Sequence, residues 1–347
     1  MLNKTIKYFL AVASIAASTT VNATSIQIIS TDGPGEGFNS AAAVEPVTGN
    51  DARTLGEQYT NVFRAAADFF EGKIISDIDI LIEAAFDPLR CEANTAQLGG
   101  AGPLNAFINF QNAPRRNTAY VSAQANSLAG VDLDPGTNDI GAVFNSSLNG
   151  DEGCLGGVTW WLGINSPAPA RTVSLYDTVL HEIGHGLGFL TFVDSDGVRI
   201  QSTQGTPFND PYMLNLFDVV QDLPWSQMTD EQRAKSSLNN GSLVWSGQAV
   251  AQGAGVFTGG RNGSGQLRIY APREFDEGSS VSHWDVAVGP NELMEPFATP
   301  TSNGCATILA LRDMGWRTQN ECPGGATSPE GSNPRPSNTN DPAGSGG

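Results

Sequence analysis

The order of the predicted elements indicates an α+β fold. The first half of the chain predicts a strand, a long helix, several short strands and a second helix, in that order. The two helices are indicated by apolar residues at helical spacing. The strands are indicated by short runs of alternating or β-branched residues between glycine-rich and polar turns.

The elements of the first half can be placed one by one. Residues 25–29 predict a strand, and a glycine-rich turn follows at 32–37. Residues 52–72 predict an amphipathic helix with an apolar side made of Leu55, Tyr59, Val62, Phe63, Ala66, Phe69 and Phe70. Further strands are predicted at 74–85, 104–110, 118–123 and 140–144.

The second helix is predicted to begin after Ser174. Ser174 and Asp177 have the spacing of a capping box, which marks the start of a helix. Gly186 and Gly188 favour the end of the helix and a sharp turn of the backbone. Apolar residues recur between them at helical spacing, namely Leu175, Val179, Leu180, Ile183 and Leu187.

The second half predicts less regular structure. Residues 192–280 form an insertion with short strands at 217–220 and 243–245 and a helix at 229–238. We find no chemistry of its own in this insertion and expect it to cover one side of a cleft. Residues 306–316 are again helix-like.

The chain contains only three histidines, and two of them lie in an H-E-I-G-H run at 181–185. Helical residues four apart share a face, so His181 and His185 can point at one ion. A catalytic zinc takes three protein ligands and leaves one position for water, whose pKa it lowers to about 7. Glu182 is the candidate general base for that water, and His283 is the candidate third ligand.

Three motifs together resemble the active-site pattern of the leishmanolysin-like metzincins. They are H-E-I-G-H-G-L-G-F from residue 181, S-H-W-D at 282–285 and E-L-M-E-P at 292–296. Most metzincins place the third histidine soon after the motif, where this chain has Thr191. The leishmanolysin-like branch delays it behind a long insertion, as this chain does. The sequence is therefore similar to a secreted bacterial zinc metallopeptidase of that branch.

The resemblance implies a fold of two subdomains. Residues 24–191 would form an N-terminal catalytic subdomain, a mixed twisted sheet with the zinc-binding helix. Residues 192–322 would form a mostly irregular and helical C-terminal subdomain with the insertion and the third ligand. Met294 would be the methionine of the turn beneath the zinc site. An edge strand between residues 118 and 148 would bind the substrate backbone.

Other candidates for the site residues remain open. A glutamate ligand some 20 residues after the motif is excluded, because no glutamate occurs between residues 186 and 230. Asp194 and Asp196 are alternative third ligands, since carboxylates also bind zinc. Asp177 and Asp285 are candidates to orient His181 and His283. Asp177 can equally serve the positive end of the helix.

The two ends of the sequence predict processing and export. Residues 1–23 read as a secretory signal peptide, with two lysines, a short apolar core and a small-residue cleavage site. Residues 323–347 are rich in glycine, serine, proline and asparagine, which predicts a disordered tail. We expect a secreted protein, with the periplasm as the alternative, and no span of the membrane.

Four cysteines in an exported chain predict disulfides. Three pairings are open, and we favour Cys91–Cys154 and Cys305–Cys322 because these are nearest in sequence. None of the cysteines has the C-x-x-C spacing of a metal site.

The formal net charge of −18 argues against a general nucleic-acid-binding protein. Aspartate-rich loops at 132–134 and 194–197 could hold Ca²⁺ in addition to Zn²⁺, although neither has EF-hand spacing. The oligomeric state stays open.

The favoured function is that of a secreted zinc endopeptidase that cleaves a protein or peptide substrate. Two alternatives remain. One is a zinc hydrolase of a non-peptide amide, such as a cell-wall component. The other is an extracellular binding protein on an inactive metzincin scaffold, which the intact Glu182 disfavours.

Overall fold

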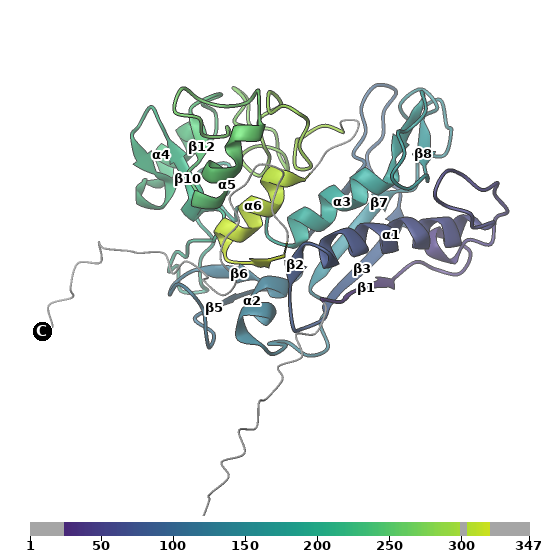
Figure 1. Ribbon diagram of the computed structural model, residues 1–347, viewed down its shortest axis with the longest axis horizontal. Helices are drawn as coiled ribbons and strands as arrows, with labels where there is room; N and C mark the ends of the chain where they lie inside the picture. Colours follow the sequence, from purple (N-terminus) through teal and green to yellow (C-terminus); the bar gives the residue numbers. More distant parts are fainter. Residues whose placement is uncertain (1–23, 299–303, 320–347) are drawn as a thin grey trace, which may run out of the picture.

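Four strands form the largest sheet of the protein, in the order β1–β3–β7–β4. Figure 1 labels β1, β3 and β7. The computed structural model describes residues 24–298 and 304–319. In the sheet, β1, β3 and β7 run parallel and β4 is antiparallel at one edge. The strands are β1 (Ile26–Ser30), β3 (Ile80–Asp87), β7 (Ile140–Asn145) and β4 (Gly99–Pro103).

Two helices lie side by side across one face of this sheet, α1 (Leu55–Glu71) and α3 (Leu175–Gly186) (Figure 1). The Thr54 side chain caps α1 by accepting the Glu57 N–H. The apolar side of α1 is buried against the sheet and α3, as its spacing predicts. Helix α3 is also buried, since ten of its twelve residues lie in the interior.

The other elements are short. A three-stranded sheet contains β11 (Leu223–Pro224), β10 (Leu216–Asp218) and β12 (Leu243–Trp245). Two-stranded pairs join β13 (Arg317–Thr318) to β2 (Ile74–Ile75), β5 (Ala106–Ile108) to β6 (Ala119–Val121), and β8 (Thr159–Trp161) to β9 (Thr172–Ser174). The remaining helices are α2 (Ser122–Ala129), α4 (Asp230–Ser236), α5 (Gln248–Gly253) and α6 (Cys305–Met314).

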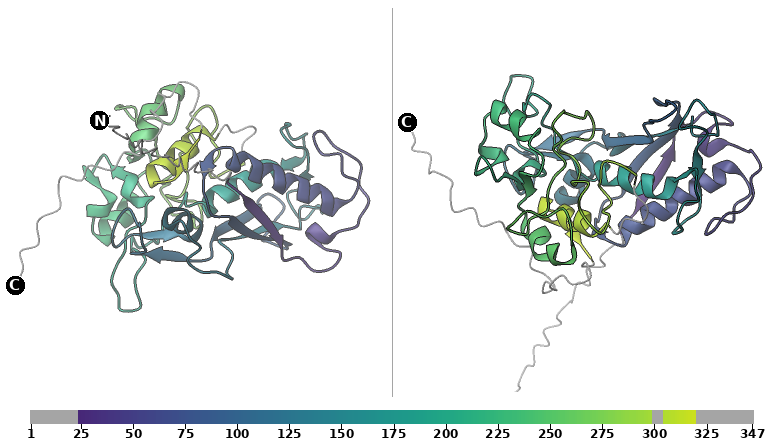
Figure 2. Two further views of the ribbon diagram at one scale, coloured as in Figure 1. Left: turned by 60° about the horizontal axis from the view of Figure 1, so that its bottom comes forward. Right: turned by 90° about the horizontal axis from the view of Figure 1, so that it is seen from above.

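The predicted α+β class is confirmed, because the structure combines several small sheets with a few helices. In both views of Figure 2, the insertion (green) lies on the side of the molecule opposite β1 and α1 (purple and dark blue). The chain then returns, because β13 pairs with β2 beside the end of α1. A metzincin fold with a border at residue 191 stays a prediction.

Some predicted elements have different boundaries. The strand expected at 74–85 is two strands in different sheets, separated where the Ser76 side chain bonds the backbone of Ile78. The strand expected at 118–123 ends at Val121, where α2 begins. The sheet edge beside α3 is β4, which lies outside the range 118–148; within that range β7 is interior to the largest sheet and β6 pairs only with β5.

A cluster of aromatic rings joins the insertion to the end of α3. Phe189 stacks against Trp245 and packs on Tyr212 and Trp284. Trp245 and Trp284 also contact each other, and all four side chains are buried. This cluster fixes the loop that carries His283 relative to the helix that carries the H-E-I-G-H run.

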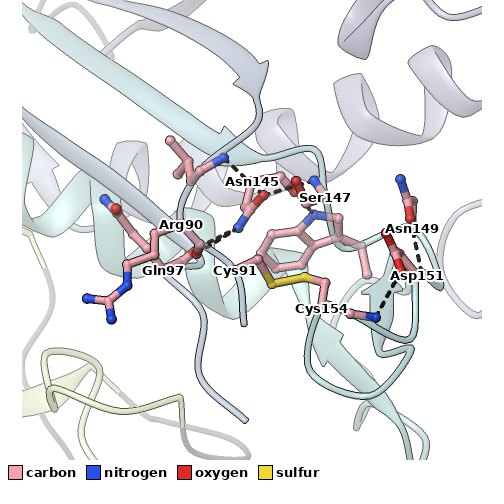
Figure 3. The surroundings of a disulfide bond; sticks show 11 residues. Arg90, Cys91, Gln97, Asn145, Ser147, Asn149, Asp151 and Cys154 are labelled. Carbon is pink, nitrogen blue, oxygen red and sulfur yellow. Dashed lines mark hydrogen bonds between the residues drawn. A yellow bond between two sulfur atoms is a disulfide. The ribbon is translucent and has the colours of Figure 1, made fainter. Parts of the chain in front are cut away.

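The predicted disulfide Cys91–Cys154 is confirmed (Figure 3). It joins the loop after β3 to the loop before β8. The Asn145 side chain fixes the same region, since it accepts the N–H of Ser147 and donates to the carbonyl of Gln97 (Figure 3). The second predicted pairing stays a prediction, because Cys322 lies outside the described residues.

The predicted signal peptide (1–23) and the predicted tail (323–347) also lie outside the described residues. Within 24–298 and 304–319, we find no helix with the length and apolar character needed to cross a membrane.

Replacing Cys91 and Cys154 together by Ala tests the contribution of this disulfide. The two cysteines are 63 positions apart, and cross-linking a loop of that size stabilises a fold by about 4 kcal/mol in the chain-entropy account. We expect the double variant to lose stability of that order, measured by denaturant titration. A variant as stable as the wild type would contradict the expectation.

Candidate metal centre

The structure brings the three histidines of the chain together. His181 and His185 lie one turn apart on α3, and His283 approaches from the loop after the insertion. The three Nε2 atoms are 3.0 Å (181–283), 3.1 Å (181–185) and 3.2 Å (185–283) apart. His185 and His283 are buried, and His181 is half-buried.

The other nitrogen of each ring bonds a backbone carbonyl. Nδ1 of His181 lies 2.9 Å from Leu293 O, that of His185 is 2.8 Å from Phe189 O, and that of His283 is 2.8 Å from Ser279 O. A carbonyl can only accept a hydrogen bond, so each Nδ1 must carry the proton. In a neutral imidazole Nε2 then carries a lone pair and no proton. Three lone pairs therefore face one another at hydrogen-bond distance with no proton between them.

A cation at the centre of this triangle would remove the repulsion. Zinc binds imidazole nitrogen at about 2.0–2.1 Å in tetrahedral geometry, which places ligand nitrogens about 3.3 Å apart. The three observed separations are close to that value. Among the described residues, this is the one group of three His, Cys, Asp or Glu side chains whose ligand atoms lie within 4.8 Å of one another. The three histidines therefore fit a metal ion, and which ion they bind is considered under the proposed function.

Burial keeps the histidines neutral. It lowers the pKa of His181 to about 4 and that of His185 to about 3, while the hydrogen bond that each ring donates to Leu293 O or Phe189 O acts in the opposite direction. Burial also lowers the pKa of His283 well below its usual value, aided by the two neighbouring rings. At neutral pH all three rings are therefore in the form that binds a metal.

Glu182 lies between α3 and the edge strand β4. Its side chain is buried. A Cβ atom at Gly99 would lie 3.4 Å from Glu182 Cγ, so the strand packs closely on the glutamate. Burial raises the pKa of Glu182 to about 8. β4 is not predictable from the sequence, because the run Gly99–Pro103 has almost no side chains to show a strand pattern.

Met294 packs against α3 at Gly184. Its side chain is completely buried. A Cβ atom at Gly184 would lie only 2.5 Å from Met294 Sδ, so the methionine occupies the space that a side chain at 184 would need. The glycine inside the H-E-I-G-H run is therefore a packing requirement, which its position in the sequence did not reveal.

The candidate orienting carboxylates do not hold the rings. Asp177 is four residues before His181 in sequence, yet Leu293 O bonds that ring. Asp285 accepts the Ala287 N–H, and its Oδ1 lies 3.6 Å from Arg268 Nη2. The ring of His283 bonds Ser279 O instead. A backbone acceptor leaves no mark in the sequence, so these partners could not be predicted.

The alternative ligands also lie elsewhere. Asp194 is exposed and accepts the N–H groups of Asp196 and Val198 within its own loop. Within the described part of the chain, neither this loop nor the loop at 132–134 belongs to a three-carboxylate cluster of metal-binding size. The calcium hypothesis thus gains no support from the structure.

Comparison of the chain with protein families, curated proteins and solved structures finds no match. The resemblance to the leishmanolysin-like metzincins therefore rests on the sequence motifs alone and stays a prediction.

Gly184→Ala tests the packing of Met294 against α3. Ala normally stabilises a helix interior by about 1 kcal/mol relative to Gly. Here the methionine must move, so we expect a loss of about 1–3 kcal/mol and weaker metal binding, measured by thermal unfolding and zinc competition. Gly255→Ala is the matched control, since a Cβ there meets nothing within 4 Å. Equal behaviour of the two variants would contradict the prediction.

The protonation of the histidines can be followed directly by NMR, because the chain has only three. In metal-free protein we expect no ring to titrate near pH 6.5, because burial lowers the pKa of His181 to about 4, that of His185 to about 3 and that of His283 well below its usual value. The unfolded chain takes up these protons from pH 6.5 downward and the folded protein does not. The free energy of unfolding should therefore fall as the pH drops from 6.5 towards 4. A ring that titrates at 6.5 would contradict this account.

Proposed function

We propose that the protein is a zinc-dependent endopeptidase with His181, His185 and His283 as metal ligands and Glu182 as general base. The observation that carries the proposal is the convergence of three unprotonated Nε2 atoms beside a buried glutamate. Three histidines with one open position are the ligand set of a catalytic rather than a structural zinc. The motif resemblance supports a peptidase within that class.

A bound zinc would supply a Lewis acid that polarises a carbonyl group and lowers the pKa of water. Glu182 supplies the proton transfer. Burial makes its carboxylate a stronger base than an exposed glutamate, and the side chain packs against the edge strand at Gly99. Glu182 takes the proton of the attacking water and passes it to the leaving nitrogen, so one side chain serves both halves of the hydrolysis.

The edge strand β4 is the proposed binding surface for the substrate backbone. It lies at the open edge of the sheet and directly against Glu182. An extended peptide can add to such an edge through main-chain hydrogen bonds, which recognise the peptide backbone rather than its side chains. This supports a peptide substrate over a small non-peptide amide.

The disulfide Cys91–Cys154 supports an extracellular or periplasmic location, because disulfides persist in oxidising compartments. The two alternative functions are a non-peptide amidase and a non-catalytic binding protein. The buried base beside the histidines favours catalysis, since a binding protein has no use for it.

Digestion of a peptide library with and without a chelator distinguishes the three functions. We expect cleavage inside peptides that stops when zinc is removed and returns when zinc is added. Zinc binding without cleavage of any peptide would leave the amidase or the binding protein. A protein that binds no zinc would overturn the proposal.

Two variants separate the roles of ligand and base. Glu182→Gln should retain zinc and lose nearly all cleavage, because the amide cannot accept the proton. His283→Ala should lose both, because only two ligands remain. Zinc is measured by mass spectrometry and cleavage with casein. Normal turnover by Glu182→Gln would exclude its role as base.

A further inference from the structure

Glu292 is a buried carboxylate outside the proposed ligand set. Its side chain is 1% exposed. The residue directly precedes Leu293 and Met294, in the turn that contacts the histidines. One oxygen accepts the Ala306 N–H at 2.9 Å. The other accepts the Thr307 hydroxyl at 2.8 Å and the Leu293 N–H at 2.9 Å.

Two of these donors belong to the first turn of α6, which has no cap of its own. The N-cap residue is Gly304, which has no side chain to accept the free N–H groups of that turn. Glu292 supplies the missing acceptor from another part of the chain, and its negative charge also suits the positive end of the helix. The turn at 292–294 is thereby fixed to α6.

The same turn holds two of the three histidines. Leu293 O accepts the bond from His181 Nδ1 at 2.9 Å. Met294 O accepts the N–H of Trp284, the residue after His283, at 2.8 Å. The indole of Trp284 donates to the Thr307 hydroxyl, which itself donates to Glu292. Both histidines therefore depend on a turn whose position Glu292 determines.

We propose that Glu292 is a positioning residue of the metal site, which holds the backbone acceptor of His181 and the neighbour of His283 through its bonds to α6. This inference rests on the proposed metal site. Groups that orient metal-bound histidines change metal affinity when they are removed, typically by a factor of about 10–100. Glu292 acts one step further out, through the backbone that it fixes.

The chain offers a matched control in Asp313. This carboxylate also caps a neighbouring helix, α5, whose N-cap residue Gly247 has no side chain. It accepts the N–H groups of Ala249 and Val250 and the indole N–H of Trp245. Among the described residues, none of these three partners forms a hydrogen bond with a histidine or with the turn at 292–294. Trp245 reaches the site only through ring packing on Phe189 and Trp284.

Glu292→Gln and Asp313→Asn make the same chemical change in the two caps. Each replaces an acceptor oxygen by an NH₂ group that faces N–H donors. We expect both to lower the melting temperature. Only Glu292→Gln should weaken zinc binding, by about 10–100-fold in a competition titration. It should also change the visible spectrum of the Co²⁺-substituted protein, which reports ligand geometry. Equal zinc affinity in the two variants would overturn the inference.

Hydrogen exchange in the wild type tests the same coupling without any substitution. If the turn links the metal site to α6, zinc must slow exchange of the Ala306 and Thr307 amides, because coupling between sites is reciprocal. The Ala249 and Val250 amides, which donate to Asp313, should slow less. Equal slowing at both pairs would overturn the inference, even if Glu292→Gln does not fold. A wild type that binds no zinc would instead overturn the proposed function.

Discussion

The mutual repulsion of three imidazole lone pairs is the constraint on which the centre of this protein depends. Each ring could relieve that repulsion by turning over, so that a proton replaced the lone pair. The carbonyls of Leu293, Phe189 and Ser279 oppose this, because each requires a donor from its ring. The fold thus keeps an unfavourable arrangement that a cation makes favourable, and burial prevents protons from taking the cation's place.

The three carbonyls come from three different segments, so the centre forms only when distant parts of the chain are packed. Phe189 follows α3, Ser279 lies at the end of the insertion, and Leu293 belongs to the turn before α6. The aromatic cluster around Trp245 and Trp284 holds the first two segments together. The Glu292 network joins the third to α6. A local motif on one helix therefore needs the insertion in order to become a site.

Sequence reasoning found those parts of the fold whose side chains form a pattern. The amphipathic helix at 52–72, the strands at 25–29 and 140–144 and the helix after Ser174 are present because burial on one face dictates residue type. The three histidines were predicted to meet because their side chains carry the chemistry. The glycine-rich strand β4 and the carbonyl partners of the rings were missed, because backbone groups are the same in every residue. Asp177 and Asp285 were proposed instead, since only side-chain acceptors can be read from a sequence.

The small side chains of β4 bear on whether molecules of this protein associate with one another in solution. An open sheet edge can pair with the same edge of another molecule, and natural proteins usually prevent this with lysines, prolines or bulges on the strand. Four of the five β4 residues are glycine or alanine, which leaves Pro103 as the one such protection. The formal net charge of −18 supplies a long-range repulsion that the strand itself lacks. Salt screens that repulsion, so high ionic strength should favour self-association through the edge.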